Sequence, residues 1–357
     1  MLVPSGDVAY LVVASIVPMA ATVARRRMRE KGLLDGPPQH WEGLRSRVLR
    51  VAAIDMGTNS TRLLVADVGD GRVEVIRRES RVTGLGRGVE ISGQLSTEAI
   101  ERVFGAISDY LAIASELGAV ETFAFATSAA RDAANSAAFI AELRERFDLS
   151  ASVLSGEDEA ELTYLGARGS CADCETVVVD IGGGSTELVV GSGGEPTYNA
   201  SLQLGVVRHT ERHLHNDPPL TNELESLAED VGGTIDAELV AHPGLRADRG
   251  VAVAGTPAIL AAMDLGLERV DYARIEGHEL DLATVQKLLS RLASLPVDER
   301  RAVRGVDPDR APTIVAGVVI LVKAMRAFAL ERITVSERDI LFGAAQRAAE
   351  RHAAATG

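Results

Sequence analysis

From residue 51 onward, hydrophobic and polar positions follow the periods of strands and helices in turn. Residues 51–54 form a short apolar run of the strand type, and residues 61–68 and 73–78 flank a Gly-Asp-Gly turn, which predicts a β-hairpin. Ser96 is a preferred N-cap residue for a helix reaching Leu117, and Gly118 occupies the position where glycine commonly ends a helix.

The same alternation continues through the middle of the chain. The pattern predicts strands at 122–126, 152–154 and 176–181 and helices at 135–147 and 158–168. Strands that alternate with helices indicate an α/β fold. The chain has 357 residues, whereas a single hydrophobic core stops growing at roughly 250–300 residues. We therefore expect two domains with a cleft between them.

Two segments that follow apolar strands share one sequence frame. Residues 55–65 (DMGTNSTRLLV) and 180–190 (DIGGGSTELVV) are identical at six of eleven positions, with the common pattern D-x-G-x-x-S-T-x-L-x-V. Each segment leaves one apolar strand, turns and enters another. The same motif in the same strand-turn-strand context indicates a duplicated domain.

The first 48 residues have a different character. An apolar run at 8–23 is interrupted by Pro18 and followed by three arginines. The run is shorter than the roughly 20 residues of a membrane-spanning helix, and its positive charges follow it instead of preceding it as in a signal peptide. We therefore expect residues 1–48 to be a dispensable extension outside the core, without stable membrane insertion.

Charge and cysteine content narrow the class of protein. The net charge is −14 and the pI is about 5.1, which argues against a nucleic-acid-binding surface, because such surfaces are basic. Cys171 and Cys174 are the two cysteines, so no disulfide framework is expected and a reducing cytoplasm fits. Their C-x-x-C spacing lacks the further ligands of a zinc site, and we expect an inert pair in a loop.

The two repeated turns have the composition of phosphate-binding loops. A strand-turn-strand segment of small residues directs several backbone N–H groups toward one point, and glycine lets the backbone approach a ligand closely. Asp55 and Asp180, at the strand ends, offer the hard oxygen ligands that Mg²⁺ prefers. A hairpin turn with a capping Asp is the alternative for either motif taken alone. The residues expected to bind phosphate are Gly57, Thr58, Asn59, Ser60, Gly182, Gly183, Gly184 and Ser185.

Three histidines, His209, His213 and His215, lie close together in the sequence and raise the question of a metal cluster. They lie in a polar stretch that lacks the H-E-x-x-H pattern of a helical zinc site. Solvated surface histidines are therefore the preferred interpretation.

The residues of several motifs point to one protein family, whereas the alternating pattern points only to a fold class. In order, the chain resembles the exopolyphosphatase/guanosine pentaphosphate phosphatase family in VAAIDMGTNSTRLL at 51–64, ATSAARDAAN at 126–135, LSGEDEA at 154–160, VDIGGGSTE at 179–187, AGT at 254–256, DRA at 309–311 and ITVSE at 333–337. The resemblance covers about residues 49–345. It implies duplicated ribonuclease H-like domains of the actin-like ATPase type, with an interdomain cleft.

The resemblance also implies how the chain divides. Residues 49–155 together with 342–357 would form domain I, and residues 156–341 would form domain II. A closing helix at 339–352 would pack back on domain I. Residues 1–48 stay outside this scheme.

A general base and its metal follow from the resemblance. Glu159, directly before Ala160, is the implied base that activates the attacking water. Asp180 is the implied Mg²⁺ ligand, assisted by Glu187 and Asp55, with Mn²⁺ as the substitute ion. A solvated acidic helix start is the alternative interpretation of Glu159.

Two arginines complete the implied site. Arg131 and Arg310 match family arginines near the substrate phosphates. The planar guanidinium suits this role because it binds phosphate bidentately and stays charged. Surface ion pairs, such as Arg131 with Asp132, are the alternative.

The implied activity is that of an exopolyphosphatase, which hydrolyses the terminal phosphoanhydride of inorganic polyphosphate and releases orthophosphate in the cytoplasm. A guanosine pentaphosphate phosphatase stays open, because its substrate presents the same terminal bond. A weakly catalytic alarmone-binding regulator would not require Glu159, Asp180 and Glu187 together, and a sugar or acetate kinase would need an acceptor site that no motif indicates. A homodimer also stays open.

Overall fold

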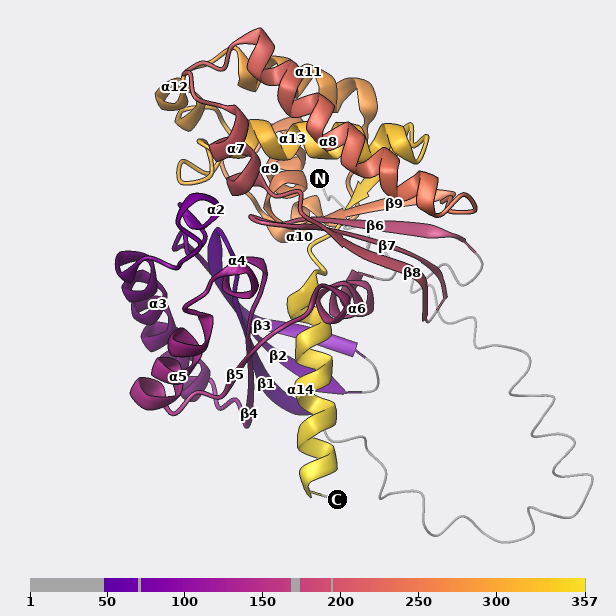
Figure 1. Ribbon diagram of the computed structural model, residues 1–357. Helices are drawn as coiled ribbons and strands as arrows, with labels where there is room; N and C mark the ends of the chain where they lie inside the picture. Colours follow the sequence, from indigo (N-terminus) through magenta and orange to yellow (C-terminus); the bar gives the residue numbers. More distant parts are fainter. Residues whose placement is uncertain (1–47, 70–71, 168–173, 194, 357) are drawn as a thin grey trace, which may run out of the picture. The chain divides into compact units, whose positions relative to one another are not determined.

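The computed structural model describes residues 48–69, 72–167, 174–193 and 195–356. The first sheet has the strand order β3-β2-β1-β4-β5 (Figure 1). Strands β1 to β3 form an antiparallel meander, and β4 and β5 extend the sheet in parallel on the other side of β1. Their bounds are β1 Leu49–Met56, β2 Ser60–Gly69, β3 Arg72–Val82, β4 Glu121–Ala126 and β5 Ala151–Val153.

The second sheet repeats this topology. Its order is β10-β11-β9-β6-β7-β8, in which β6 to β8 form the meander and β9 and β11 lie parallel on the other side of β6. The prediction of a duplicated α/β domain of the ribonuclease H-like, actin-like type is confirmed. The strands are β6 Thr176–Ile181, β7 Thr186–Ser192, β8 Glu195–Leu202, β9 Arg249–Val253, β10 Glu279–Asp281 and β11 Arg332–Val335.

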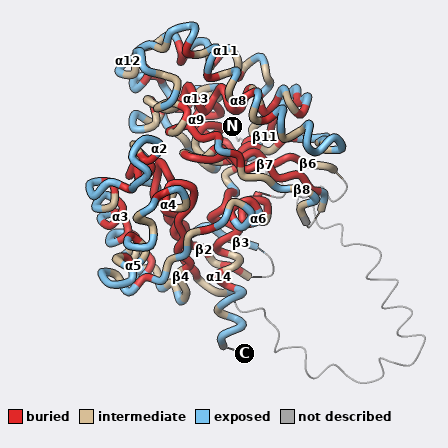
Figure 2. The backbone as a smooth tube through the Cα atoms, viewed as in Figure 1, coloured by how far each residue is buried: buried red, intermediate tan, exposed pale blue. Residues whose placement is uncertain are grey.

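Helices cover both faces of each sheet, so the central strands are buried, whereas the edge strand β3 is largely exposed (Figure 2). On the first sheet, α3 and α5 pack on one face and α14 on the other. On the second sheet, α8, α9, α11 and α13 cover one face and α6 the other. The helices are α2 Val89–Ser92, α3 Thr97–Glu116, α4 Ser128–Asp132, α5 Ser136–Phe147, α6 Gly156–Ala167, α7 Val206–His213, α8 Thr221–Ala241, α9 Gly255–Asp264, α10 Tyr272–Ile275, α11 Leu282–Ala293, α12 Val297–Arg301, α13 Ile314–Ala327 and α14 Ile340–Thr356.

Helices α6 and α14 cross at two glycines. A Cβ on Gly166 would lie 2.1 Å from the carbonyl oxygen of Asp339, and a Cβ on Gly343 would lie 2.0 Å from that of Leu162. Both distances are shorter than any contact between a carbon and an oxygen that are not bonded to each other. A side chain at either position would therefore push the helices apart. Because α6 packs on the second sheet and α14 on the first, this crossing joins the two halves of the core.

The predicted elements agree with the structure. Ser96 caps α3 by accepting a hydrogen bond from the N–H of Ala99 at 3.2 Å, and Gly118 follows the helix with φ of 76°. The predicted hairpin is the β2–β3 pair, although the turn residues Asp70 and Gly71 lie outside the described residues.

Several expectations concern parts of the chain that the structure does not describe. The predicted extension at 1–48 lies outside the described residues except for Val48, and so does Cys171. The thiol of Cys174 is not free, because this residue is disulfide-bonded. Among the described residues, no helix combines the length and the apolar composition needed to cross a bilayer. The division into domains stays a prediction.

The start of α8 is held by one carboxylate. Glu223 accepts hydrogen bonds from the backbone N–H of Leu220 at 2.8 Å, from the N–H of His215 at 2.9 Å and from the backbone and side chain of Asn216. These hydrogen bonds to the charged form, led by the one from Leu220, lower the pKa of Glu223 to about 2. The ionised carboxylate of Glu223 therefore holds the loop before α8 in place.

We expect Glu223→Gln to lower the free energy of unfolding at neutral pH. Because the folded-state pKa is depressed, the stabilisation is present above the usual value of 4.5 and is lost as the pH falls toward about 2. Urea unfolding of both proteins across this pH range should show their stabilities converging. Glu225→Gln, an exposed neighbour on the same helix, is the control. A difference that stays constant down to pH 2 would contradict the role of the charge.

Candidate active site

The two repeated motifs form the same turn in the two sheets. In the first, the N–H of Gly57 donates to the carbonyl of Ser60 at 3.0 Å, and in the second, the N–H of Gly182 donates to the carbonyl of Ser185 at 2.9 Å. We call Gly57–Asn59 the first loop and Gly182–Ser185 the second loop. The sequence repeat is therefore also a structural repeat.

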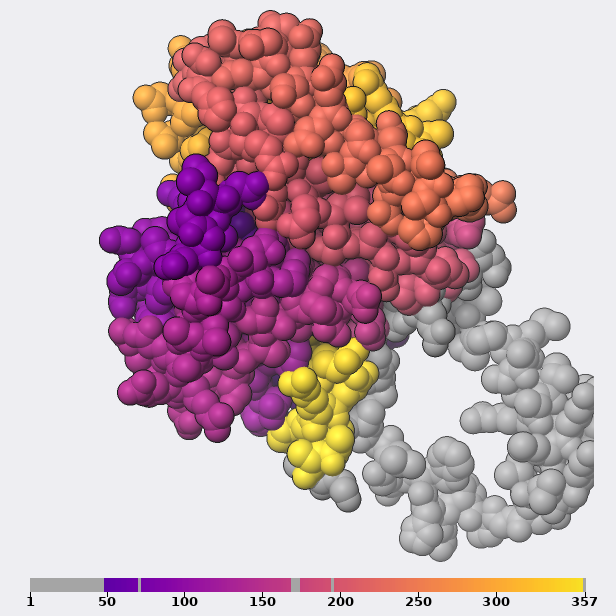
Figure 3. Space-filling view, in the orientation of Figure 1, coloured from indigo at the N-terminus to yellow at the C-terminus, as the bar shows by residue number. Residues whose placement is uncertain are grey.

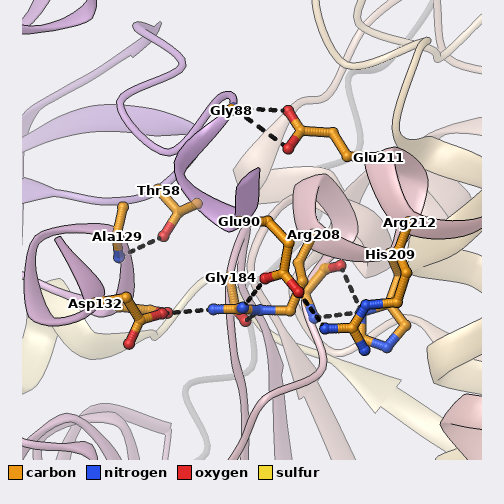
Figure 4. Close-up of polar contacts among 12 residues, drawn as sticks. Thr58, Gly88, Glu90, Ala129, Asp132, Gly184, Arg208, His209, Glu211 and Arg212 are labelled. Carbon is orange, nitrogen blue, oxygen red and sulfur yellow. Dashed lines mark hydrogen bonds and ion pairs between the residues drawn. The ribbon is translucent and has the colours of Figure 1, made fainter. Parts of the chain in front are cut away.

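The two loops contact one another directly. A Cβ on Gly183 would lie 2.7 Å from the Cβ of Thr58 and 2.8 Å from the backbone nitrogen of Asn59, and a Cβ on Gly184 would lie 2.5 Å from the hydroxyl of Ser128. Thr58 also accepts a hydrogen bond from the N–H of Ala129 at 3.1 Å (Figure 4). The second loop needs glycine because the first loop and α4 leave no space for side chains.

One pocket lies between the loops and gathers most of the predicted site. The predicted residues that line it are Asp55, Gly57, Thr58, Asn59, Ser60, Glu159, Asp180, Gly182, Gly183, Gly184, Ser185, Glu187 and Arg310. Of the predicted set, Arg131 does not line this pocket. Residues from both sheets and from α6 thus face one space.

Four buried carboxyl groups, from Asp55, Glu159, Asp180 and Glu187, dominate its electrostatics. Burial raises the pKa of Glu159 to about 7 and that of Asp180 to about 7, since low polarity disfavours the charged form. The pKa of Glu187 is raised well above its usual value, first by burial and then by the nearby charges of Glu159 and Asp180. Four carboxyl groups this close together favour the binding of a positively charged group or ion in the pocket.

Arg62 balances part of this negative charge. Its guanidinium binds Asp55 at 2.5 Å and Asp339, from the loop before α14, at 2.6 Å. Arg78 binds the same carboxylate of Asp339 at 2.7 Å. The sequence analysis did not select Arg62, although it stands opposite Asp55 in the strand pair as Glu187 stands opposite Asp180. The repeat therefore carries an arginine in one half and an acid in the other.

Arg131 contacts the predicted base directly. Its Nη1 lies 3.0 Å from Oε2 of Glu159 and donates to the carbonyl of Leu154 at 3.0 Å. The alternative pairing with Asp132 is wrong, because Asp132 is bound by Arg208. The Nη2 of Arg131 is buried without a hydrogen-bond partner.

Arg310 reaches Ser60, the residue directly after the first loop, from the other half of the chain. Its Nη2 donates to the hydroxyl of Ser60 at 3.1 Å, and a Cβ on Gly255 would collide with its guanidinium at 1.8 Å. Burial lowers the pKa of Arg310 against the opposing effect of Tyr272 and Asp307. A bound anion would compensate the charge of this guanidinium.

The donor set fits a hard divalent cation. The Oδ1 of Asp55 is buried without a hydrogen-bond partner, while Asp180 accepts one weak bond from Thr163 at 3.3 Å. Among the described residues, no three carboxylates bring oxygens within 4.8 Å of one another. Mg²⁺ suits this spacing because it commonly takes one or two carboxylates and keeps several waters.

The three histidines lie outside the pocket lining, and they differ from one another. His215 is exposed, as expected. The expectation of a solvated side chain is wrong for His209, which is fully buried on the inner face of α7 beside Val206 and Val207. The side chain of His213 is only 11% exposed. Because the segment is polar overall, the sequence did not predict that one face of α7 packs against the core.

Comparison with known proteins gives the family. The model of the Ppx/GppA phosphatase family matches residues 64–345. The chain belongs to the Ppx/GppA phosphatase family. Its relatives include Exopolyphosphatase 2 of Mycobacterium tuberculosis, which is 37% identical over 311 residues and is matched over 83% of this chain and 97% of its own length.

Solved structures of Ppx/GppA relatives share the fold. An exopolyphosphatase from Cytophaga hutchinsonii aligns with a TM-score of 0.76 at 26% identity, covering 82% of this chain and 96% of its own. A Ppx/GppA family member from Aquifex aeolicus aligns with a TM-score of 0.71 at 28% identity, covering 86% and 99%. The similarity therefore extends over nearly the whole of each relative.

We expect Arg131→Ala to shift the acidic limb of the pH–rate profile to higher pH. Arg131 lowers the pKa of Glu159 against the effect of burial, so its removal raises that pKa further and protonates more of the base at pH 7. Activity at pH 7 should fall and recover partly as the pH rises. Profiles of kcat/KM against pH would test this.

Arg131→Lys is the matched variant. A point charge should restore part of the shift but not the hydrogen-bond geometry of the guanidinium. An unchanged limb in Arg131→Ala would show that Arg131 does not control the base.

Proposed function

We propose that this chain is an exopolyphosphatase that hydrolyses the terminal phosphoanhydride of inorganic polyphosphate and releases orthophosphate. The observation that carries the proposal is the convergence of both repeated loops and Glu159 on one pocket. Similarity over 97% of the length of Exopolyphosphatase 2 supports the same substrate class.

Backbone N–H groups of the two loops and the guanidinium of Arg310 would bind the terminal phosphates. The hydroxyls of Thr58, Ser60 and Ser185 add donors. The unpartnered Nη2 of Arg131 is a further donor for a substrate oxygen. This set orients the terminal phosphorus and compensates its charge, which is most of what phosphoryl transfer requires.

Glu159 would act as the general base. Its carboxylate takes a proton from water, the water oxygen bonds to the terminal phosphorus, and the bond from phosphorus to the bridging oxygen breaks. A pKa near 7 suits this task, because the base is then partly ionised yet strong enough to accept the proton. Arg131 holds the carboxylate in place.

We propose Mg²⁺, or Mn²⁺ in its place, as the cofactor, held by Asp180 with Glu187 and Asp55. A bound cation would neutralise phosphate charge and polarise the terminal phosphate. The orphaned oxygen of Asp55 and the raised pKa values of the neighbouring acids support a cation here. The cytoplasmic location and a homodimer stay predictions.

The decisive experiment compares phosphate release from short polyphosphate, long polyphosphate and guanosine pentaphosphate, with Mg²⁺ and with EDTA. We expect turnover of polyphosphate that requires the divalent cation. Turnover of guanosine pentaphosphate alone would replace the proposed substrate with that nucleotide, and binding of the nucleotide without turnover would favour a regulator. Full activity in EDTA would contradict the cofactor.

A further inference from the structure

A second cluster of ligand-type side chains lies away from the pocket. His209 and His213 stand one turn apart on α7, and Asp230 faces them from α8. One ligand atom from each of the three residues lies within 4.8 Å of the other two. Spacing of i and i+4 places both imidazoles on one face of the helix.

His209 has an unsatisfied ring nitrogen directed at this cluster. The residue is fully buried, its Nε2 has no hydrogen-bond partner, and this atom lies 3.5 Å from Oδ2 of Asp230. Ligands at 2.0–2.2 Å from a tetrahedral zinc ion are separated from each other by roughly 3.3–3.5 Å. The separation therefore suits two ligands of one ion better than a hydrogen bond.

The remaining distances require little adjustment. The Nε2 of His213 lies 2.8 Å from the same carboxylate oxygen, so it would move away by about half an ångström to share an ion. Asp230 is one-third exposed and also binds Arg212 at 3.2 Å, so its carboxylate can rotate. Solvent could supply the fourth ligand on that side.

The outer nitrogens of both rings are already oriented. The Nδ1 of His209 lies 3.2 Å from the carbonyl oxygen of Gly205, and the Nδ1 of His213 lies 3.2 Å from the hydroxyl of Ser226. Metal-bound histidines usually make such contacts with their second nitrogen, which fixes the ring and its tautomer. In the tautomer whose Nδ1–H donates to the carbonyl of Gly205, the lone pair of Nε2 faces Asp230; the backbone N–H of Gly205, 3.3 Å from the same Nδ1, would pair with the other tautomer.

We propose that His209, His213 and Asp230 form a binding site for a divalent transition-metal ion of the zinc type. Two imidazole nitrogens favour Zn²⁺ or Co²⁺ over Mg²⁺, which prefers oxygen. The site is thus chemically different from the carboxylate pocket, and the two can be filled selectively.

The site lies on a helix that connects the two halves. Arg208 of α7 donates to the carbonyl of Gly184 in the second loop at 2.9 Å and binds Glu90 and Asp132 of the first half (Figure 4). Glu211 accepts from the N–H of Gly88 at 3.1 Å. The α2 segment accordingly meets the second half of the molecule on the face drawn in Figure 3. An ion that ties α7 to α8 would therefore stiffen the support of the second loop.

The test is a Co²⁺ titration of the full chain without an affinity tag, stripped of metal by a chelator and kept in excess Mg²⁺ to fill the carboxylate pocket. Tetrahedral Co²⁺ with nitrogen ligands gives visible d–d absorption. We expect this absorption to saturate at one ion per chain, to disappear on adding Zn²⁺, and to be lost in Asp230→Asn and in His213→Gln.

Two controls separate this site from its surroundings. His215→Gln removes an exposed histidine outside the cluster, and Asp180→Asn alters the carboxylate pocket; both variants should keep the absorption. Absence of the band from the unmodified chain, its persistence in His213→Gln, or its loss in Asp180→Asn would each overturn the proposal. If Asp230→Asn does not fold, His213→Gln decides alone, and Zn²⁺ should raise the Tm of the unmodified chain but not of this variant.

Discussion

Replacing Glu159 with Gln is expected to reduce kcat by about 10²–10⁴ while KM changes little. Gln keeps the shape of the side chain and can still contact Arg131, but its amide cannot accept a proton from water. Because the loops and arginines proposed to bind phosphate are untouched, substrate binding should survive. Steady-state kinetics on polyphosphate with Mg²⁺ would measure both constants.

The structure supplies matched controls for this variant. Glu157 and Glu161 lie on the same helix and are exposed, and Glu161 pairs with Arg347 on α14. Gln at either position should leave kcat nearly unchanged. Equal effects at all three positions would mean that Glu159 is only part of a solvated acidic helix start. A fully active Glu159→Gln enzyme would make Glu187 the next candidate for the base.

The second large effect is expected for Asp180→Asn. Loss of this carboxylate should reduce turnover by on the order of 10²–10³ and weaken the dependence on Mg²⁺, because cation binding and charge compensation are lost together. A titration of activity against Mg²⁺ would show the weaker dependence. Asp148→Asn is the control, since Asp148 is exposed at the end of α5 in a left-handed conformation that Asn tolerates.

The same substitution should not destabilise the fold. Burial first, and then the nearby charges of Asp339 and Asp55, raise the pKa of Asp180, so a neutral Asn removes an unfavourable buried charge. We expect a Tm equal to or above that of the unmodified chain, in keeping with the general conflict between active-site chemistry and stability. A strong fall in Tm would mean that the loss of activity reflects unfolding and not the missing ligand.

The sequence predicted the local elements and the two loops well because their causes are local. Ser96 and Gly118 mark the ends of α3 through hydrogen bonding and backbone conformation within a few residues. The D-x-G-x-x-S repeat encodes the same turn twice, and the residues predicted to bind phosphate line one pocket.

Long-range pairing could not be predicted in the same way. Arg62 meets Asp339 across 277 residues, and no periodicity links the two positions. The burial of His209 depends on how α7 packs against the second core, which the polar composition of the segment did not reveal. The contact of Arg131 with Glu159 likewise depends on the meeting of α4 and α6.

The long separation in sequence between the first sheet and α14 has a consequence for biosynthesis. This helix covers the face of the first sheet that carries Phe123, Phe125 and Leu64, so that face stays bare until the helix is made. About 190 residues separate β5 from α14, which corresponds to roughly 10–40 s of translation at about 5–20 residues per second. The nascent chain is therefore expected to expose an apolar face of its first sheet for this time and to complete its first core only once α14 has left the ribosome.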